Sequence, residues 1–136
     1  MTQYDIIQAL AAKARALSGI RAAPDDPPDT ALAYPFAVTY FQSGSWRGDD
    51  ATWKTAPQTF AIDLYMGRYP DAGRILATYS EYPESLGQAI VSDENLTAAV
   101  TLVKEVRCRF ARMNYIGIDC FGYHFEIDVT AISAKA

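Results

Sequence analysis

The residues best suited to chemistry lie near the C-terminus, where the single histidine of the chain alternates with acids. His124, Glu126 and Asp128 occupy every second position of the segment GYHFEIDV. Because successive side chains of a β-strand point to opposite faces, these three would share one face of a sheet. A histidine beside carboxylates can act as a general base. One hypothesis is therefore a small hydrolase or ligand-binding domain centred on His124.

Other charged residues would join this face from neighbouring predicted strands: Asp63, Glu105, Arg107 and Arg109. Ion pairs across strands explain the same arrangement without catalysis. One histidine cannot build the usual multi-histidine metal sites. The chain also has no glycine-rich phosphate loop, G-x-S-x-G, C-x-x-C or H-E-x-x-H motif. The sequence therefore favours a protein that is not an enzyme and needs no metal or cofactor.

An acidic, proline-rich connector forms a second unusual stretch. It contains Asp25, Asp26 and Asp29, together with Pro24, Pro27, Pro28 and Pro35. A calcium loop would alternate oxygen ligands and close with a glutamate, and that pattern is missing. The residue types favour a solvated linker stiffened by its prolines.

Two tryptophans fall in a polar segment, SGSWRGDDATWKTAP. Trp46 and Trp53 stand there among serines, aspartates, Arg47 and Lys54. Tryptophan and arginine are enriched among the residues that anchor protein interfaces. Each indole ring could instead fold back over the edge of its own sheet, and the sequence leaves both interpretations open.

The first half of the chain predicts a helix followed by two strands. Apolar residues recur at helical spacing from Thr2 until Gly19, a natural helix stop. A short extended piece at 20–23 and the acidic connector follow. Alternating residues then predict strands at 36–41 and 59–66, joined by a long hairpin loop.

The second half predicts two helical pieces and two further strands. A helix over 71–82 is expected to break at Pro83 and to resume over 84–91. The inward residues of these helices are expected to be Ile75, Leu76, Tyr79, Leu86 and Ile90. In the last two strands, the apolar face would carry Leu102, Val106, Cys108 and Phe110 on one strand and Phe121, Tyr123, Phe125, Ile127 and Val129 on the other.

These elements predict an α+β fold, a two-layer sandwich. Its sheet would be mainly antiparallel and four-stranded, with the helices packed on one face. The length of 136 residues suits a single domain, residues 1–136. Cys108 and Cys120 fall in neighbouring strands without facing each other, so both are expected to be reduced thiols packed as small apolar groups.

Charge and hydropathy exclude two classes of function. The net charge is −4, and the densest basic cluster is only Arg107, Arg109 and Arg112. Nucleic-acid binding needs a concentrated positive stripe, so it is not expected. No apolar run approaches the roughly 20 residues that a membrane span requires. A soluble protein made in the cytoplasm is expected.

The order of elements and several segments resemble the tail terminator, or tail completion, proteins of long-tailed bacteriophages of the lambda type. The likeness is carried by the segments LSGIRAAPDDPP, YPFAVTY, FAIDLYMGRYPDAGRILA, DENLTAAV and YIGIDCFGYHFEIDVTA. Together they extend over nearly the whole chain.

The resemblance implies a structural protein of the virion, located at the head-proximal end of the tail and assembled in the host cytoplasm. It would form a homo-oligomer, a hexameric ring that caps the tail tube protein, stops tail growth and offers a surface to a neck or head-completion protein. DNA would pass through without specific binding, and no membrane would be involved.

Two sets of residues receive roles on this hypothesis. Trp46, Arg47 and Trp53 would contact a neighbouring subunit or the tube, and Asp25, Asp26 and Asp29 would line the DNA channel. Two alternatives remain: another neck component, such as a head-tail joining or stopper protein, and the hydrolase or ligand-binding domain centred on His124.

Overall fold

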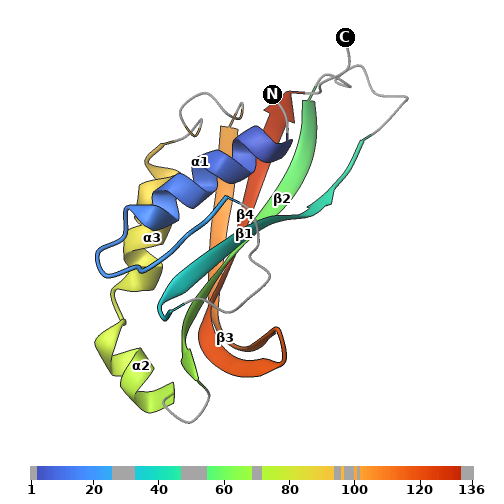
Figure 1. Cartoon of the computed structure of the whole chain (residues 1–136). Helices are drawn as coiled ribbons and strands as arrows, with labels where there is room; N and C mark the ends of the chain where they lie inside the picture. Colours follow the sequence, from blue (N-terminus) through green and yellow to red (C-terminus); the bar gives the residue numbers. More distant parts are fainter. Residues whose placement is uncertain are drawn as a thin grey trace.

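Four long strands form one antiparallel sheet in the order β1-β2-β4-β3 (Figure 1). The computed structural model describes residues 3–25, 33–46, 55–68, 72–93, 96, 100 and 102–132. Along the chain the elements are α1 (Gln3–Arg15), β1 (Phe36–Gly44), β2 (Thr55–Arg68), α2 (Ala72–Thr78), α3 (Tyr82–Val91), β3 (Leu102–Tyr115) and β4 (Ile118–Ile132).

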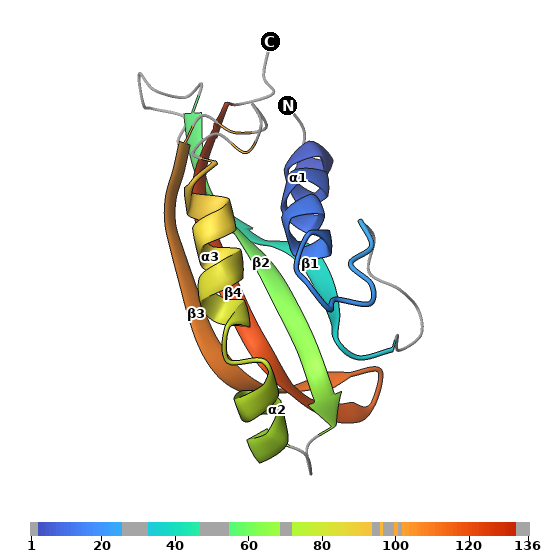
Figure 2. The same ribbon diagram turned by 90° about the vertical axis from the view of Figure 1, so that its left-hand side faces the viewer.

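The helices cover one face of this sheet, so the expected two-layer α+β sandwich is confirmed. Figure 2 shows α1 and α3 side by side in front of the strands, with α2 below α3. Helix α1 packs mainly on β1, and α3 packs on β3. The other face carries no helix among the described residues.

Strict alternation along the two central strands builds the core between sheet and helices. The sheet contributes Phe60, Ile62, Leu64 and Met66 from β2 and Phe121, Tyr123, Phe125, Ile127 and Val129 from β4. The helices contribute Ile6, Leu10 and Ala14 from α1 and Leu86 and Ile90 from α3. All of these residues are buried, as the period of two in the strands and of 3.6 in the helices predicts.

A glycine lies in the turn that follows the first helix, which ends at Arg15, four residues before the predicted stop at Gly19. Gly19 has a φ of +87°, which L-residues with side chains rarely adopt. The Tyr82 hydroxyl donates a hydrogen bond to the Ser18 carbonyl oxygen at 2.5 Å. A β-carbon at Gly19 would lie 2.8 Å from that hydroxyl oxygen. The turn after α1 is thereby held against the start of α3.

The helical break between α2 and α3 falls earlier than expected. The sequence placed it at Pro83, whereas α2 ends at Thr78 and α3 already begins at Tyr82. Pro83 lies in the first turn of α3, where a backbone N–H has no partner within the helix. Proline therefore starts this helix and does not interrupt it. Tyr79 is half-buried, and the side chains of Ile75 and Leu76 lie outside the described residues.

The expectation for the start of β3 was wrong. A bulge between Val103 and Glu105 inserts one residue into the pairing with β4. Because the period of a strand is two, this insertion moves Leu102 to the helix-free face, and Val103 packs against the core in its place. The strands β1 and β2 are also longer than expected, which shortens the loop between them.

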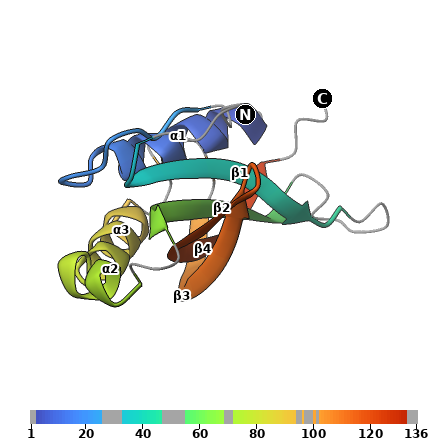
Figure 3. The same ribbon diagram turned by 60° about the horizontal axis from the view of Figure 1, so that its bottom comes forward.

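A second, smaller hydrophobic cluster lies on the helix-free face. The hairpin of β3 and β4 curls toward β1, as seen from its tip in Figure 3. Tyr115 near the tip meets Phe36 edge-on at 5.4 Å and Tyr65 edge-on at 5.0 Å. Phe36 and Tyr65 stack at 4.8 Å. The alternation of residues predicts that the helix-free face is polar and exposed, but one end of it is therefore buried under aromatic rings.

The two cysteines are both free thiols and, as expected, do not face each other. Cys120 is buried in the second cluster, and its sulfur lies 3.2 Å from the Tyr34 hydroxyl oxygen. Cys108 is exposed on β3, so the expectation that it packs as a buried apolar group was wrong. An edge strand leaves its side chains without a second neighbour to cover them.

Gly122 allows β4 to approach β2. A β-carbon there would lie 1.6 Å from the Leu64 carbonyl oxygen, in the backbone of the central strand. We predict that Gly122→Ala lowers the free energy of unfolding by about 3 kcal/mol, because the backbone itself must shift. The measurement is urea denaturation.

Gly87 in α3 provides the matched control. A β-carbon there meets nothing within 4 Å. Gly87→Ala should raise the free energy of unfolding by about 0.5 to 1 kcal/mol, because alanine favours helix. Equal effects of the two substitutions would contradict the role given to Gly122.

Candidate protein interface and the histidine network

The outer edge of β3 is the most exposed regular element that the structure describes. The strand hydrogen-bonds to β4 on one side, and the sheet ends there. Nearly all side chains along its length are exposed or half-buried. Leu102 and Phe110 are exposed apolar residues on it, at 42% and 37%. A long open edge offers unpaired backbone groups to another chain, and natural proteins usually protect such an edge.

Phe110 is held in place although it is exposed. Its ring stacks on Phe121 with the centroids 5.3 Å apart and meets Tyr123 edge-on at 5.7 Å. Both partners belong to the adjacent strand β4. A partner that covers Phe110 would therefore meet a ring whose orientation is already fixed, which lowers the entropic cost of binding.

The opposite edge of the sheet is partly protected. Ala22 forms a parallel bridge with Phe36, and the Ala37 amide donates to the Ala22 carbonyl oxygen at 2.9 Å. The Arg21 amide also donates to the Pro35 carbonyl oxygen at 2.8 Å. The short extended piece expected after the first helix thus covers the beginning of β1.

Trp46 lies just beyond the end of β1. Its ring packs in part on its own sheet and stays in part exposed, so both interpretations from the sequence apply to it. Its centroid is 6.4 Å from that of Phe41, which in turn packs edge-on against the buried Phe60. A β-carbon at Gly44 would lie 2.6 Å from the indole, so the glycine permits this approach. The residue nevertheless remains 60% exposed. Trp46 leans on its own sheet and still offers most of its surface to a partner.

The remaining residues assigned by resemblance are only partly placed. Arg47, Trp53, Asp26 and Asp29 lie outside the described residues. Asp25 forms an ion pair with Arg15, whose Nη1 lies 2.8 Å from the Asp25 Oδ1 atom. The same nitrogen donates to the Ala23 carbonyl oxygen at 2.8 Å. The connector therefore begins anchored to the end of α1.

On the helix-free face, a buried acid joins β2, β4 and β1. Asp63 is only 7% exposed. Its Oδ1 atom lies 2.5 Å from the His124 Nδ1 atom, and its Oδ2 atom accepts a hydrogen bond of 3.0 Å from the Tyr40 hydroxyl. The register pairs Asp63 with His124 directly and places Val38 opposite Asp63 on the other side. The central carboxylate is thus hydrogen-bonded at both oxygens, as a buried acid requires.

Both ring nitrogens of His124 have carboxylate neighbours. Nδ1 contacts Asp63, and Nε2 lies 3.3 Å from the Glu126 Oε1 atom. A general base needs a free nitrogen aimed at the substrate proton. Burial and the neighbouring Asp63 also raise the pKa of Tyr40, so its hydroxyl stays protonated and donating. The network is suited to holding three strands together.

Arg107 gathers the remaining acids of this face. It lies 2.9 Å from Glu105 and 3.1 Å from Glu126, and it contacts both oxygens of Asp128. Hydrogen bonds from Arg107 lower the pKa values of Glu126 and Asp128. The expected cross-strand ion pairs are therefore present between Arg107 of β3 and the β4 acids Glu126 and Asp128, whereas Glu105 pairs with Arg107 within β3 itself. Two features escaped the sequence analysis: the part played by Tyr40, and the exposure of Phe110.

The described part of the chain contains no group of three or more His, Cys, Asp or Glu residues that could hold a metal ion. None of its helices is long and apolar enough to cross a membrane.

Comparison with known proteins adds no family assignment. No model of a known protein family matches the chain, and no curated protein is significantly similar to it in sequence.

Removing the histidine should expose the structural role of the network. We predict that His124→Ala lowers the free energy of unfolding by about 2 to 3 kcal/mol, because the buried Asp63 loses a hydrogen-bond partner. Glu126→Gln, at a more exposed position, should cost within about 1 kcal/mol. Chemical denaturation of both variants tests this. An unchanged free energy of unfolding in His124→Ala would contradict the structural role.

Stability should also depend on pH through Arg107. Carboxylates whose pKa is lowered in the folded state stabilise it above their unfolded pKa, and this contribution disappears as pH falls through the folded value. We predict that Arg107→Gln costs about 1 kcal/mol at pH 7. The difference in free energy of unfolding between this variant and the unsubstituted protein should become smaller as pH falls below about 4. Thermal unfolding across this range measures it.

Arg109→Gln is the control for this experiment, because it removes the same charge from the same strand and leaves the hydrogen bonds of Arg107 intact. A loss of stability in Arg107→Gln that does not change with pH would contradict the role given to the ion pairs of Arg107. The same dependence of stability on pH in both variants would contradict it too.

Proposed function

We propose that the chain is a tail terminator subunit of a long-tailed bacteriophage, which caps the tail tube as a hexameric ring. Such a protein works by covering and being covered by other protein chains. The proposal rests on the resemblance in element order and sequence segments, and the surface of the fold supports it.

The open edge of β3 is the observation that carries the proposal. Strand β3 has a hydrogen-bonded neighbour on one side only. It also carries two exposed apolar residues, Leu102 and Phe110, and the ring of Phe110 is held in place by stacking on Phe121. A subunit that stays alone in solution gains nothing from such an edge. A subunit of a closed ring can cover it with the next copy. Exposed Trp46, at the far end of β1, supplies a second contact of the kind that anchors interfaces.

The histidine network supports a role without catalysis. Its only imidazole has carboxylates at both nitrogens, and Asp63 is buried beneath it. Arg107 ties the nearby acids of β4 to β3. This arrangement is suited to holding the strands of the subunit together.

The mechanism on this proposal is geometric. One face of the ring would copy the contact surface of a tube subunit and bind the last ring of the tube. The opposite face would lack that surface and offer contacts to a neck protein. Growth stops because the next tube ring finds no complementary surface.

The acidic balance of the chain suits a channel for DNA. With a net charge of −4, the lumen would repel phosphates, so the genome slides through without adhering. We assign Asp25, Asp26 and Asp29 to this lumen. The ion pair with Arg15 offsets the charge of Asp25, so Asp26 and Asp29 would contribute most of the repulsion.

Electron microscopy of purified tails mixed with the protein tests the proposal. We predict that the protein caps one end of each tail and that phage lacking it forms tails of uncontrolled length. Binding to the portal side of heads, with bare tails left uncapped, would instead identify another neck component. Tails of normal length, joined to full heads in its absence, would refute both.

Substitutions on the proposed contact surface sharpen this test. Phe110→Ser and Trp46→Ala should each reduce the fraction of capped tails. Val91→Ser is the matched control, because Val91 is a 52% exposed apolar residue on α3, on the other layer. The result is interpretable where each variant retains the unfolding midpoint of the natural protein. Equal capping by all three would remove β3 and Trp46 from the interface.

A further inference from the structure

A pocket of about 500 Å³ lies between the end of β2 and helix α2, away from the histidine network. Met66, Gly67 and Arg68 line it from β2, Arg74 and Thr78 from α2, and Tyr34 and Tyr79 from the adjoining segments. The register of β2 shifts between Tyr65 and Gly67, and such a bulge redirects the side chains beside it. This volume falls in the range of sites that take a small ligand or a side chain.

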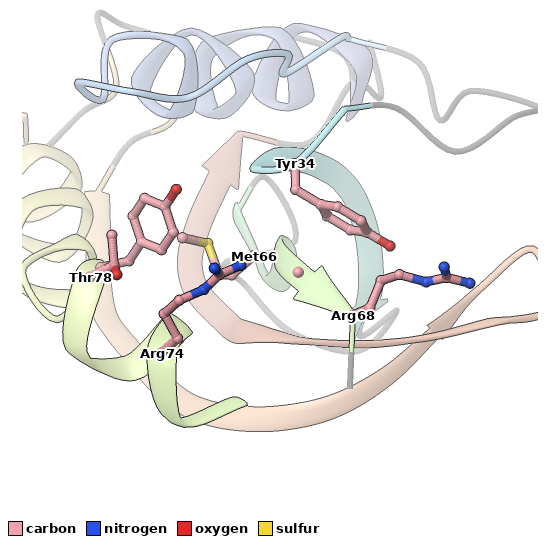
Figure 4. Close-up of a pocket in the computed structure, with 7 residues that line it drawn as sticks. Tyr34, Met66, Arg68, Arg74 and Thr78 are labelled. Atoms are coloured by element: carbon pink, nitrogen blue, oxygen red, sulfur yellow. The ribbon is translucent and has the colours of Figure 1, made fainter. Parts of the chain in front are cut away.

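The pocket concentrates positive charge in an acidic protein. Figure 4 shows Arg74 reaching from α2 toward Met66, while Arg68 lies beneath Tyr34 on the other side of the opening. The two guanidinium groups thus flank the opening from different elements, with Arg68 extending away from Arg74, and none of the described lining residues is acidic. Each guanidinium has five N–H donors, so it can bind an oxyanion in addition to a neighbour within the chain.

The aromatic wall adds no competing charge. The Tyr34 hydroxyl lies 3.2 Å from the Cys120 sulfur, and burial together with this contact raises the pKa of Tyr34 to about 12. Tyr34 therefore stays neutral beside Arg68 at physiological pH. Tyrosine, arginine and methionine are the residue types enriched where one protein binds another. The ring and thioether surfaces would cover the aliphatic part of an incoming side chain.

Charge also decides between the two polymers that could present an oxyanion. A nucleic-acid backbone brings many phosphates at close spacing and needs a continuous basic surface. This chain has a net charge of −4, and Arg107, outside the pocket, is already paired with three carboxylates. Two separate arginines on either side of one opening suit a short acidic segment, because each guanidinium can bind one carboxylate through two parallel hydrogen bonds.

We infer that the pocket between β2 and α2 binds a short acidic segment presented by a partner protein, with Arg68 and Arg74 each binding one of its carboxylates. The pocket is a contact separate from the β3 edge. The inference stands or falls independently of the tail-capping role, because its test measures binding to the subunit and not assembly.

Nuclear magnetic resonance titration with short peptides tests this inference. A capped tetraglutamate peptide should shift the backbone amide signals of Gly67, Arg68 and Arg74 in a saturable manner, and a capped tetraglutamine peptide should not. Arg68→Gln with Arg74→Gln should weaken tetraglutamate binding about tenfold, because charge-assisted hydrogen bonds are lost. Arg68→Lys with Arg74→Lys keeps the charge without the paired geometry, so its binding should be intermediate.

Arg21→Gln with Arg109→Gln provides the control, because it makes the same change in net charge at exposed positions outside the pocket. It should leave the affinity unchanged. Equal weakening by both glutamine pairs, or equal binding of the two peptides, would overturn the inference. So would tighter, arginine-dependent binding of inorganic phosphate or of a thymidine tetranucleotide, which would make the pocket a phosphate site.

Discussion

The close pairing of β2 with β4 is the constraint on which the rest of the structure depends. Gly122 lies directly against the carbonyl of Leu64, so the two central strands approach where any side chain would force them apart. This pairing sets which residues of both strands face the helices. It also sets which residues meet on the other face, where Asp63 lies opposite His124. Core and polar network are therefore consequences of one register.

The same register divides the helix-free face into two zones with different physics. Around Asp63 and Arg107 the strands are joined by hydrogen bonds and ion pairs. Toward the tip of the β3–β4 hairpin they are joined by stacked and edge-on aromatic rings, with Phe36 at the centre. The polar zone keeps charges satisfied, and the aromatic zone fixes the curl of the hairpin.

Much of the fold could be predicted from the sequence, because alternation and helical spacing report directly on burial. The core faces of β2 and β4 and the inward residues of α1 follow from those patterns. What could not be predicted depends on contacts far apart in the chain. The bulge near Val103 leaves only a break in the alternation, with Lys104 between Leu102 and Val106, and such a break does not tell which residue changes face. Tyr115 reaches Phe36 only because the hairpin curls. Pro83 fits either the end or the start of a helix, and the pattern alone does not choose.

The candidate surfaces show the same limit. The charged cluster around Arg107 was visible as a period of two, yet the same period suggested that Phe110 and Cys108 were covered. Periodicity assigns a face and carries no information on whether a strand is central or at the edge. The dense charges flanking both residues, from Lys104 to Arg112, are typical of an edge strand and could have indicated the exposure.

The two edges of the sheet differ, and this difference limits how copies can combine. The start of β1 is already occupied by the backbone near Ala22, while no described strand pairs with the outer edge of β3. Two copies that paired these edges of β3 would satisfy both at once and form a closed pair. A closed ring of three or more copies must instead match the outer edge of β3 on one copy with a different patch on the next, so its subunits would all point the same way around the ring.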